Sequence, residues 1–343
     1  MMGRADNGLP FLLQYENVAR YEDGNVIILD RTKYPTATEY VTCRDYHEVT
    51  QAIADMITQS GGPYWAAAFG MVSAARSVKN YPPEKAIEEL EKAANTLAHA
   101  RVTTSKGMEK HVTNILEVAK QSVRHGVDPE SETLVFVNQL REDDYLKARK
   151  IGENTVSLFP DNPVVLTQCF AEDFIGFTLL VALEQGKNIT LYVPETRPYL
   201  QGARLTASVA YDLGIPVTVI TDNMPGLILS KHMVDVFISA ADVITMSGYV
   251  INKIGTFQIA LAARYAGIPY FVQGEPSSSY PDISSVEIEE RDPEETLHFR
   301  GVRTAKVGVK GFYPAFDITP PHLVGAVVSS KGVFSPYDLI NNF

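Results

Sequence analysis

The chain has 343 residues, a length that favours two domains over one small core. Hydrophobic residues make up 45% of it and charged residues 21%, proportions typical of a soluble globular protein. The formal net charge of −11 argues against general nucleic-acid binding, which requires a basic surface. Two cysteines, Cys43 and Cys169, are too few for a disulfide framework and favour a reducing, cytoplasmic compartment. We find no secretion signal and no apolar run long enough to span a membrane.

Residues 1–140 are predicted to form a hairpin followed by a helical domain. The apolar segments Leu12–Arg20 and Asn25–Leu29 flank Asp23-Gly24, a strong signal for a hairpin turn. Apolar residues at helical spacing follow, interrupted by glycine and proline. The expected helices span Tyr46–Ile57, Trp65–Ala75, Pro83–His99 and Met108–His125, and Lys147–Leu158 is expected to lead into the second domain.

Residues 141–343 are predicted to form a Rossmann-like domain with a doubly wound parallel sheet, which makes the chain an α/β protein. Short apolar runs, typical of buried strands, alternate here with helical patterns, as in βαβ units. The expected strands are Val164–Thr167, Ile189–Val193, Val217–Ile220, Val236–Ile238 and Tyr270–Val272. The expected helices are Phe174–Glu184, Gln201–Leu213, Met224–Lys231 and Ile254–Ala266. The stretch Glu275–Glu290 is expected to be a loop that could cover a site.

Reactive side chains follow the predicted strands, at the edge of the sheet where parallel sheets bind ligands. Cys169 follows the first strand and Asp242 the fourth, so a thiol and a carboxylate are expected to meet at this edge. The segment Glu195–Ala207 combines arginine, glutamine and a helix start, an arrangement suited to holding a phosphate. The predicted turn Asn252–Thr256 adds Lys253 and another helix start.

Several common sites are absent from the sequence. No G-x-G-x-x-G follows a predicted strand, and no phosphate-binding G-x-x-x-x-G-K-[ST] occurs. The seven histidines are scattered without metal-ligand spacing, so no metal site is predicted. A hydrolase triad would need a histidine near Cys169, and His232 at a helix end is a poor candidate.

Each candidate residue also has a purely structural interpretation. Cys169 alone would be read as a core cysteine, and Asp242 as a residue of a strand-end turn. Arg197 and Arg204 are expected to pair with carboxylates rather than to contact a substrate. Asp222 is expected to cap the next helix.

Long motifs then connect the chain to a known family. The motifs are Glu195–Ala207, Thr221–Met224, Ala241-Asp242, Asn252–Thr256, Glu289–Pro293, Tyr313–Pro320, Arg20–Gly24 and Cys43-Arg44. With them the chain resembles the methylthioribose-1-phosphate isomerase family, whose superfamily includes ribose-1,5-bisphosphate isomerase and regulatory subunits of translation initiation factor 2B. The resemblance implies an isomerase that converts an aldose 1-phosphate to a ketose 1-phosphate in methionine salvage, as a homodimer without metal or organic cofactor.

The resemblance also implies roles for individual residues. It places the catalytic thiol at Cys169 and the catalytic carboxylate at Asp242. It places substrate or phosphate contacts at Gly61, Gly62, Arg101, Gln201, Asn252 and Lys253.

The chemistry fits an acid and a base on two sides of the sugar. The anomeric oxygen of an aldose 1-phosphate is blocked, so ring opening requires a proton on the ring oxygen. Asp242, if buried, would have a raised pKa and could donate that proton. Cys169 at a strand end is expected to be partly thiolate and to accept a proton from carbon. A hydride shift would use the same two residues differently.

The pocket departs from the family pattern. The family's Arg-Gly-Ala-Pro is Ser60-Gly61-Gly62-Pro63 here, so an arginine is missing, and the bulky Tyr64, Trp65, Phe170 and Tyr249 can reshape the site. Methylthioribose 1-phosphate and related 5-substituted or 5-deoxy pentose 1-phosphates are therefore all candidate substrates. Alternatives are a non-catalytic subunit that senses sugar phosphates or nucleotides and, less favoured, a nicotinamide dehydrogenase.

Overall fold

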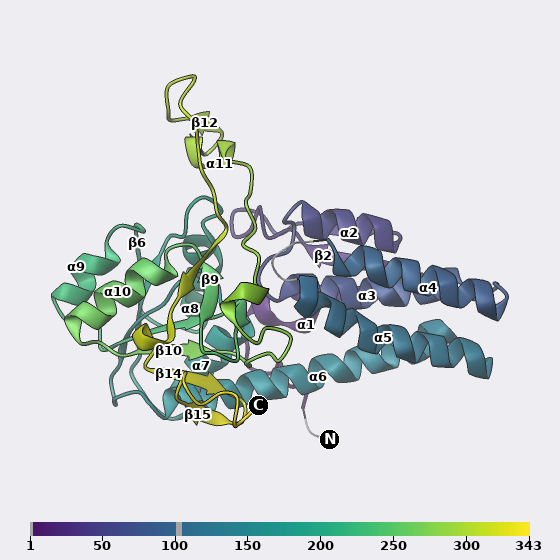
Figure 1. Cartoon of the computed structure of the whole chain (residues 1–343), viewed down its shortest axis with the longest axis horizontal. Helices are drawn as coiled ribbons and strands as arrows, with labels where there is room; N and C mark the ends of the chain where they lie inside the picture. Colours follow the sequence, from purple (N-terminus) through teal and green to yellow (C-terminus); the bar gives the residue numbers. More distant parts are fainter. Residues whose placement is uncertain (1–2, 101–104) are drawn as a thin grey trace. The chain divides into compact units, whose positions relative to one another are not determined.

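A computed structural model describes residues 3–100 and 105–343 (Figure 1). The described chain divides into two compact units, Met1–Lys147 (unit 1) and Ala148–Phe343 (unit 2). The boundary falls inside the long helix α6, which spans Pro129–Val156.

Unit 1 begins with short helical turns and a small antiparallel sheet. The turn at Asp23-Gly24 is confirmed: both residues have positive φ, +51° and +81°, as hairpin turns of this kind require. The strand predicted from Leu12 is wrong before Ala19, because the buried Leu12, Tyr15 and Val18 repeat every three residues and favour helical turns. The elements are η1 (Phe11–Leu13), α1 (Tyr15–Val18), β1 (Ala19–Glu22), β2 (Asn25–Leu29) and β3 (Tyr40–Cys43).

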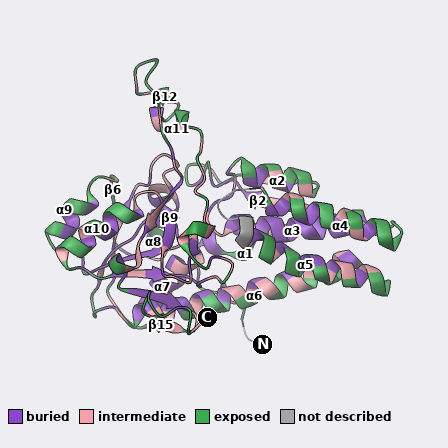
Figure 2. Ribbon diagram, viewed as in Figure 1, coloured by how far each residue is buried: buried purple, intermediate pink, exposed green. Residues whose placement is uncertain are grey.

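Helices form the rest of unit 1, and the predicted ones are confirmed within a few residues. They are α2 (Tyr46–Ala54), α3 (Gly62–Ser77), α4 (Pro83–Ala98), α5 (Ser105–His125) and the first part of α6. Helix α3 is buried over most of its length and forms the centre of this unit (Figure 2). Trp65 belongs to this core, with its ring 5.6 Å from that of His111. Helix α6 begins at Pro129, well before the segment expected from Lys147.

Unit 2 is built on a mostly parallel sheet, which confirms the predicted fold class. In the described residues this sheet has seven strands in the order β15-β14-β10-β7-β4-β5-β6, with only β15 antiparallel to its neighbour. The chain starts at the centre with β4, adds β5 and β6 on one side, and then adds β7, β10 and β14 on the other. The strands are β4 (Val164–Leu166), β5 (Thr190–Pro194), β6 (Val217–Ile220), β7 (Val236–Ala240), β10 (Tyr270–Gln273), β14 (Ala326–Ser329) and β15 (Gly332–Phe334).

Helices cover both faces of this sheet, as neighbouring residues of β10 demonstrate. Successive strand side chains point to opposite faces. Val272 packs in the core cluster that contains Ile259 of α10, whereas Gln273 donates hydrogen bonds to the hydroxyls of Thr155 in α6 and Thr178 in α7. The helical elements are α7 (Asp173–Glu184), the π-helix η2 (Gly202–Thr206), α8 (Ala207–Asp212), α9 (Pro225–Ser230) and α10 (Thr256–Ala266).

A small antiparallel sheet and an arm complete unit 2. The sheet contains β8 (Val243–Ile244), β9 (Val250–Lys253) and β13 (Phe316–Thr319), flanked by the turns η3 (Ile283–Ser285) and η4 (Pro321–Leu323). The arm carries α11 (Glu294–Leu297), β11 (His298–Phe299) and β12 (Val302–Arg303), and an isolated bridge between Glu290 and Pro314 closes its base. Figure 1 shows this arm reaching away from the sheet of unit 2. Within the described ranges, no helix is both long and apolar enough to cross a bilayer.

Candidate active site at the strand order reversal

The strand order places two reactive side chains at the point where the chain changes direction across the sheet. Strands β4 and β7 are neighbours, with Val165 opposite Val236 and Leu166 opposite Phe237. Connections leave these two strands toward opposite sides, which opens a crevice above their carboxyl ends. Cys169 follows β4 and Asp242 follows β7, so both residues come from the loops that border this crevice.

Cys169 is held in a left-handed conformation beside charged groups. Its φ is +60°, and its carbonyl oxygen accepts a hydrogen bond from the hydroxyl of Thr206. Burial raises the pKa of the Cys169 thiol to about 11; the Lys253 ammonium opposes this shift and the Asp242 carboxylate adds to it. These effects require thiol, carboxylate and ammonium to lie near one another. The expectation of a partly ionised thiol in the free protein is wrong, because burial outweighs the nearby positive charge.

Asp242 sits in the short connection between β7 and β8. Its backbone N–H donates to the carbonyl of Ile251 in β9 at 2.9 Å, which ties the connection to the small sheet. The residue is half-buried and so is not sealed inside the core. A carboxyl group that exchanges protons with a bound molecule must be accessible in this way.

Three further candidates are buried in the same unit. Gln201, Asn252 and Lys253 are 4%, 6% and 4% exposed. The Lys253 ammonium lies 5.0 Å from the centre of the Phe316 ring, and the Asn252 amide donates to the Thr256 hydroxyl at 3.0 Å. Asn252 and Lys253 belong to strand β9 rather than to the predicted turn, because the chain from Phe316 pairs with this segment.

Acidic side chains occupy the backbone N–H groups that were expected to hold a phosphate. The Asp222 carboxylate accepts from the N–H groups of Thr196 and Arg197, each at 2.7 Å. Asp317 accepts from the N–H groups of Gly255 at 2.7 Å and Phe257 at 3.1 Å. A phosphate at either position would displace a carboxylate, so both expectations are corrected. Asp222 thus fixes the loop before it in the chain, not the helix after it.

The arginines of the Glu195–Ala207 segment have structural roles. Arg197 donates to the carbonyl oxygens of His298 at 2.7 Å and Glu295 at 3.3 Å, which anchors the arm. Arg204 donates to the carbonyl of Tyr199 at 2.9 Å. These hydrogen bonds to backbone carbonyls hold the local fold and the arm in place.

Arg291 and Tyr313 were not assigned a role from the sequence, yet both are electrostatically coupled to Cys169. The Arg291 charge lowers the pKa of the Cys169 thiol, and the thiol in turn influences Tyr313. The Arg291 N–H donates to the Tyr313 carbonyl at 2.9 Å, so the two residues are neighbours across the base of the arm. Arg291 belongs to the motif Glu289–Pro293 and Tyr313 to the motif Tyr313–Pro320. Their presence in these motifs is the feature of the sequence that could have identified them as site residues.

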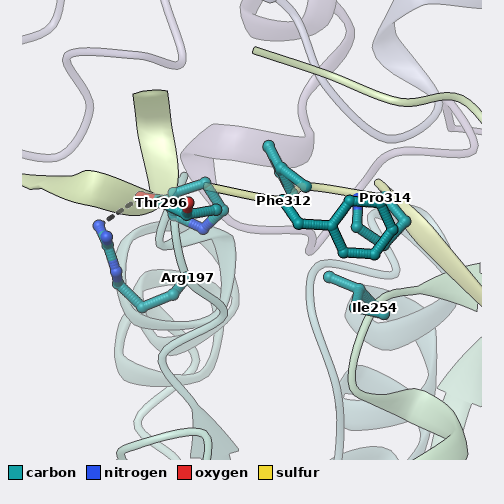
Figure 3. A pocket seen from close by; sticks show the side chains of 7 residues that line it. Arg197, Ile254, Thr296, Phe312 and Pro314 are labelled. Carbon is teal, nitrogen blue, oxygen red and sulfur yellow. Dashed lines mark hydrogen bonds between the residues drawn. The ribbon is translucent and has the colours of Figure 1, made fainter. Parts of the chain in front are cut away.

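A pocket of about 250 Å³ opens next to this cluster (Figure 3). In Figure 3, Arg197 and Thr296 lie on one side of it and Ile254, Phe312 and Pro314 on the other. Pro198 and Tyr313 complete its lining. Ile254 directly follows Lys253, and the Tyr313 carbonyl accepts from the Arg291 N–H, so the lining lies near these two residues. Cys169 and Asp242 are not among the residues that line this pocket. Within the described residues no group of three or more His, Cys, Asp or Glu side chains is arranged to hold a metal ion.

The remaining candidates belong to unit 1 or lie outside the described residues. Gly61 precedes helix α3 and Gly62 is its first residue. A Cβ atom at Gly62 would lie 2.0 Å from the Thr58 hydroxyl oxygen, so this position requires glycine. Arg101 lies outside the described residues.

Comparisons with known proteins give consistent results. Residues 63–336 match the model of the "Initiation factor 2 subunit family". A protein of Desulforamulus reducens named methylthioribose-1-phosphate isomerase is 38% identical, with 93% of this chain and 96% of that protein covered. One of the same name from Chloroflexus aurantiacus is 35% identical, with 92% and 94% covered.

Solved structures of two kinds are also similar. The 5-methylthioribose 1-phosphate isomerase of Pyrococcus horikoshii has a TM-score of 0.80 and 28% identity, covering 95% of this chain and 96% of that one. The subunit delta of translation initiation factor eIF-2B from A. fulgidus has a TM-score of 0.79 and 33% identity, covering 94% and 97%.

Proposed function

The chain belongs to the initiation factor 2 subunit family, and we propose that it converts S-methyl-5-thioribose 1-phosphate to the corresponding ketose 1-phosphate in methionine salvage. It is an enzyme of the isomerase class, like the relatives that match it over nearly their whole length. One observation carries the proposal for the site: Cys169 and Asp242 come from neighbouring strands where the strand order reverses, close enough for one charge to shift the pKa of the other.

Asp242 and Cys169 divide the proton transfers between them. Protonated Asp242 gives its proton to the ring oxygen, and the bond between this oxygen and C1 breaks. The Cys169 thiolate takes the proton from C2, and the electrons of that C–H bond form a C1–C2 double bond. The Asp242 carboxylate then takes the proton of the 2-hydroxyl and the Cys169 thiol returns its proton to C1, which gives the ketose 1-phosphate. In a hydride shift, the hydrogen would move from C2 to C1 with its electron pair.

The substrate contacts follow from the charge and burial of the surrounding groups. Lys253 supplies a positive charge next to the thiol, and Gln201 and Asn252 offer amides for sugar hydroxyls or phosphate oxygens. Gly61, Gly62 and Arg101 are further proposed contacts, on the strength of the family resemblance. A homodimer and a small sugar phosphate, without nucleic acid or membrane, are the partners that we propose.

Turnover by the purified protein tests this function. We expect conversion of methylthioribose 1-phosphate to a ketose, and a loss of roughly 10²- to 10⁴-fold in kcat for Cys169→Ser and Asp242→Asn. Cys43→Ala, which changes the buried cysteine of β3, is the matched control and should keep wild-type kcat. 5-Deoxyribose 1-phosphate and ribose 1-phosphate tested in parallel identify the preferred C5 substituent. No turnover of any pentose 1-phosphate would refute the proposal.

A non-catalytic subunit is the second candidate, because the A. fulgidus initiation-factor subunit is as similar in structure as the isomerase. The two candidates predict different results in a thermal shift assay with nucleotides and sugar phosphates. Stabilisation by a nucleotide without turnover of any sugar phosphate would favour the sensing subunit. Turnover that depends on Cys169 would exclude it.

A further inference from the structure

Buried donors without partners gather beside the thiol in unit 2. The Arg291 side chain is only 6% exposed, and its Nε donates to the Glu289 carboxylate at 2.7 Å. Its terminal nitrogens Nη1 and Nη2 are buried without a hydrogen-bond partner anywhere in the described residues. The Tyr313 hydroxyl, on a residue 4% exposed, also lacks a hydrogen bond of normal geometry within those ranges, although the Arg291 side chain lies close enough to oppose the raised pKa that burial gives this hydroxyl.

The surrounding residues hold this guanidinium in a fixed position. The rings of Tyr199 and Phe316 lie 5.3 and 5.8 Å from it, and the Glu289 carboxylate fixes its Nε. Buried donors that lack acceptors are costly, and proteins retain them where a ligand supplies the acceptor. The Lys253 ammonium lies 5.0 Å from the centre of the same Phe316 ring, so the three donor atoms share a neighbourhood with this ammonium and indicate an acceptor oxygen of the bound molecule.

The charge balance indicates which oxygen this is. Arg291 is already paired with Glu289, so the pair contributes little net charge and suits an oxygen that becomes negative during the reaction. The loop of the thiol lies in the same neighbourhood, because the Gln168 amide, next to Cys169, donates to the carbonyl of Ile254, next to Lys253, at 3.2 Å. The oxygen attached to C2 loses its proton and becomes the ketone carbonyl. It is bonded to the carbon from which the hydrogen is removed, so it is the oxygen closest to the reaction.

We propose that the terminal nitrogens of Arg291 and the hydroxyl of Tyr313 form an oxyanion site for the oxygen on C2 of the substrate. The inference rests on the proposed isomerase function and adds two catalytic residues to it. In both routes this oxygen loses its own proton before it becomes the ketone carbonyl, so it passes through an anionic state that the site would stabilise. These donors stabilise the transition state more than the bound substrate, so their removal should lower kcat rather than raise KM.

Tyr313→Phe is the cleanest test, because it removes only the hydroxyl. We expect kcat to fall roughly 10- to 100-fold with KM changed less than about threefold. Since the hydroxyl lacks a hydrogen bond of normal geometry among the described residues, the melting temperature without substrate should stay the same or rise. Arg291→Lys, which keeps the charge opposite Glu289 but loses the planar fork, should lower kcat roughly 10²- to 10³-fold.

Tyr270→Phe is the matched control. The Tyr270 hydroxyl is also buried, but it is hydrogen-bonded to Ser239 at 2.7 Å, so its removal should lower the melting temperature and leave kcat unchanged. Wild-type kcat in Tyr313→Phe and Arg291→Lys would overturn the inference, as would a higher KM with unchanged kcat, which would instead indicate phosphate or ground-state sugar binding. A wild-type enzyme without any turnover would overturn the proposed function, and the inference with it.

Discussion

The ionisation of Cys169 separates the two routes for hydrogen transfer. Burial raises the pKa of this thiol to about 11, with Asp242 adding to the shift and Lys253 opposing it. A thiol with a raised pKa is almost entirely protonated at neutral pH, so only a small fraction of the enzyme carries the thiolate. A proton-transfer mechanism must draw on that fraction, whereas a hydride shift does not require a thiolate.

The proposed proton transfer therefore predicts exchange of hydrogen with the solvent. The thiolate fraction grows about tenfold per pH unit below the pKa, but the fraction of protonated Asp242 falls in step, so the pH profile of kcat does not separate the two routes. Deuterium from heavy water should appear at C1 of the product, as mass spectrometry would detect. A product without deuterium at C1 would instead assign the reaction to the hydride shift.

At the scale of elements, acidic side chains hold the loops that carry the site. The Asp222 carboxylate fixes the loop after β5 through the Thr196 and Arg197 N–H groups, and Gln201 follows at the start of the helical segment that leads into η2. Asp317 in β13 fixes the start of α10, directly after Lys253. Burial raises the pKa of Asp317 to about 6, while the Gly255 and Phe257 N–H groups oppose the shift. Both carboxylates therefore hold segments that carry proposed substrate contacts.

Asp222→Ala should therefore lower both stability and substrate affinity. Two hydrogen bonds to a carboxylate are lost, so we expect a decrease of about 2–4 kcal/mol in the free energy of unfolding, measured by urea denaturation. KM should rise because Gln201 loses its fixed position, while kcat falls less. Asp212→Ala, at the exposed end of α8, is the control and should change stability by less than about 0.5 kcal/mol. Equal stability of the two variants would contradict this role of Asp222.

At the scale of the whole molecule, the arm of unit 2 presents apolar side chains to the surface. Phe299, Val302 and Phe312 are 40%, 66% and 70% exposed. Exposed apolar groups gathered on one segment commonly mark a surface that contacts another protein. Homodimers are the commonest oligomers, and the family resemblance implies one here.

We accordingly expect a homodimer in solution. Light scattering coupled to size-exclusion chromatography should give a mass about twice that of the 37.8 kDa chain. The mass should stay the same on dilution through the micromolar range. A mass near 37.8 kDa at every concentration would contradict the dimer.

The sequence by itself determined the alternation of strands and helices in unit 2, and with it the edge at which Cys169 and Asp242 meet. That inference depends on hydrophobic periodicity, which is a local property of the sequence. It also depends on the position of ligands in parallel sheets, which is the same in every protein of this architecture. The same periodicity identified the helices of unit 1, and Asp23-Gly24 identified its hairpin.

Only the tertiary structure decided which groups remain available for chemistry. Asp222 occupies N–H groups more than twenty residues away in the chain, Asp317 does so from β13, and neither pairing leaves a periodic signal in the sequence. The protonation of Cys169 and the unpaired donors of Arg291 and Tyr313 likewise arise from burial and from neighbours distant in sequence. Solvation and long-range contacts set the reactivity of a side chain, and both exist only once the chain has folded.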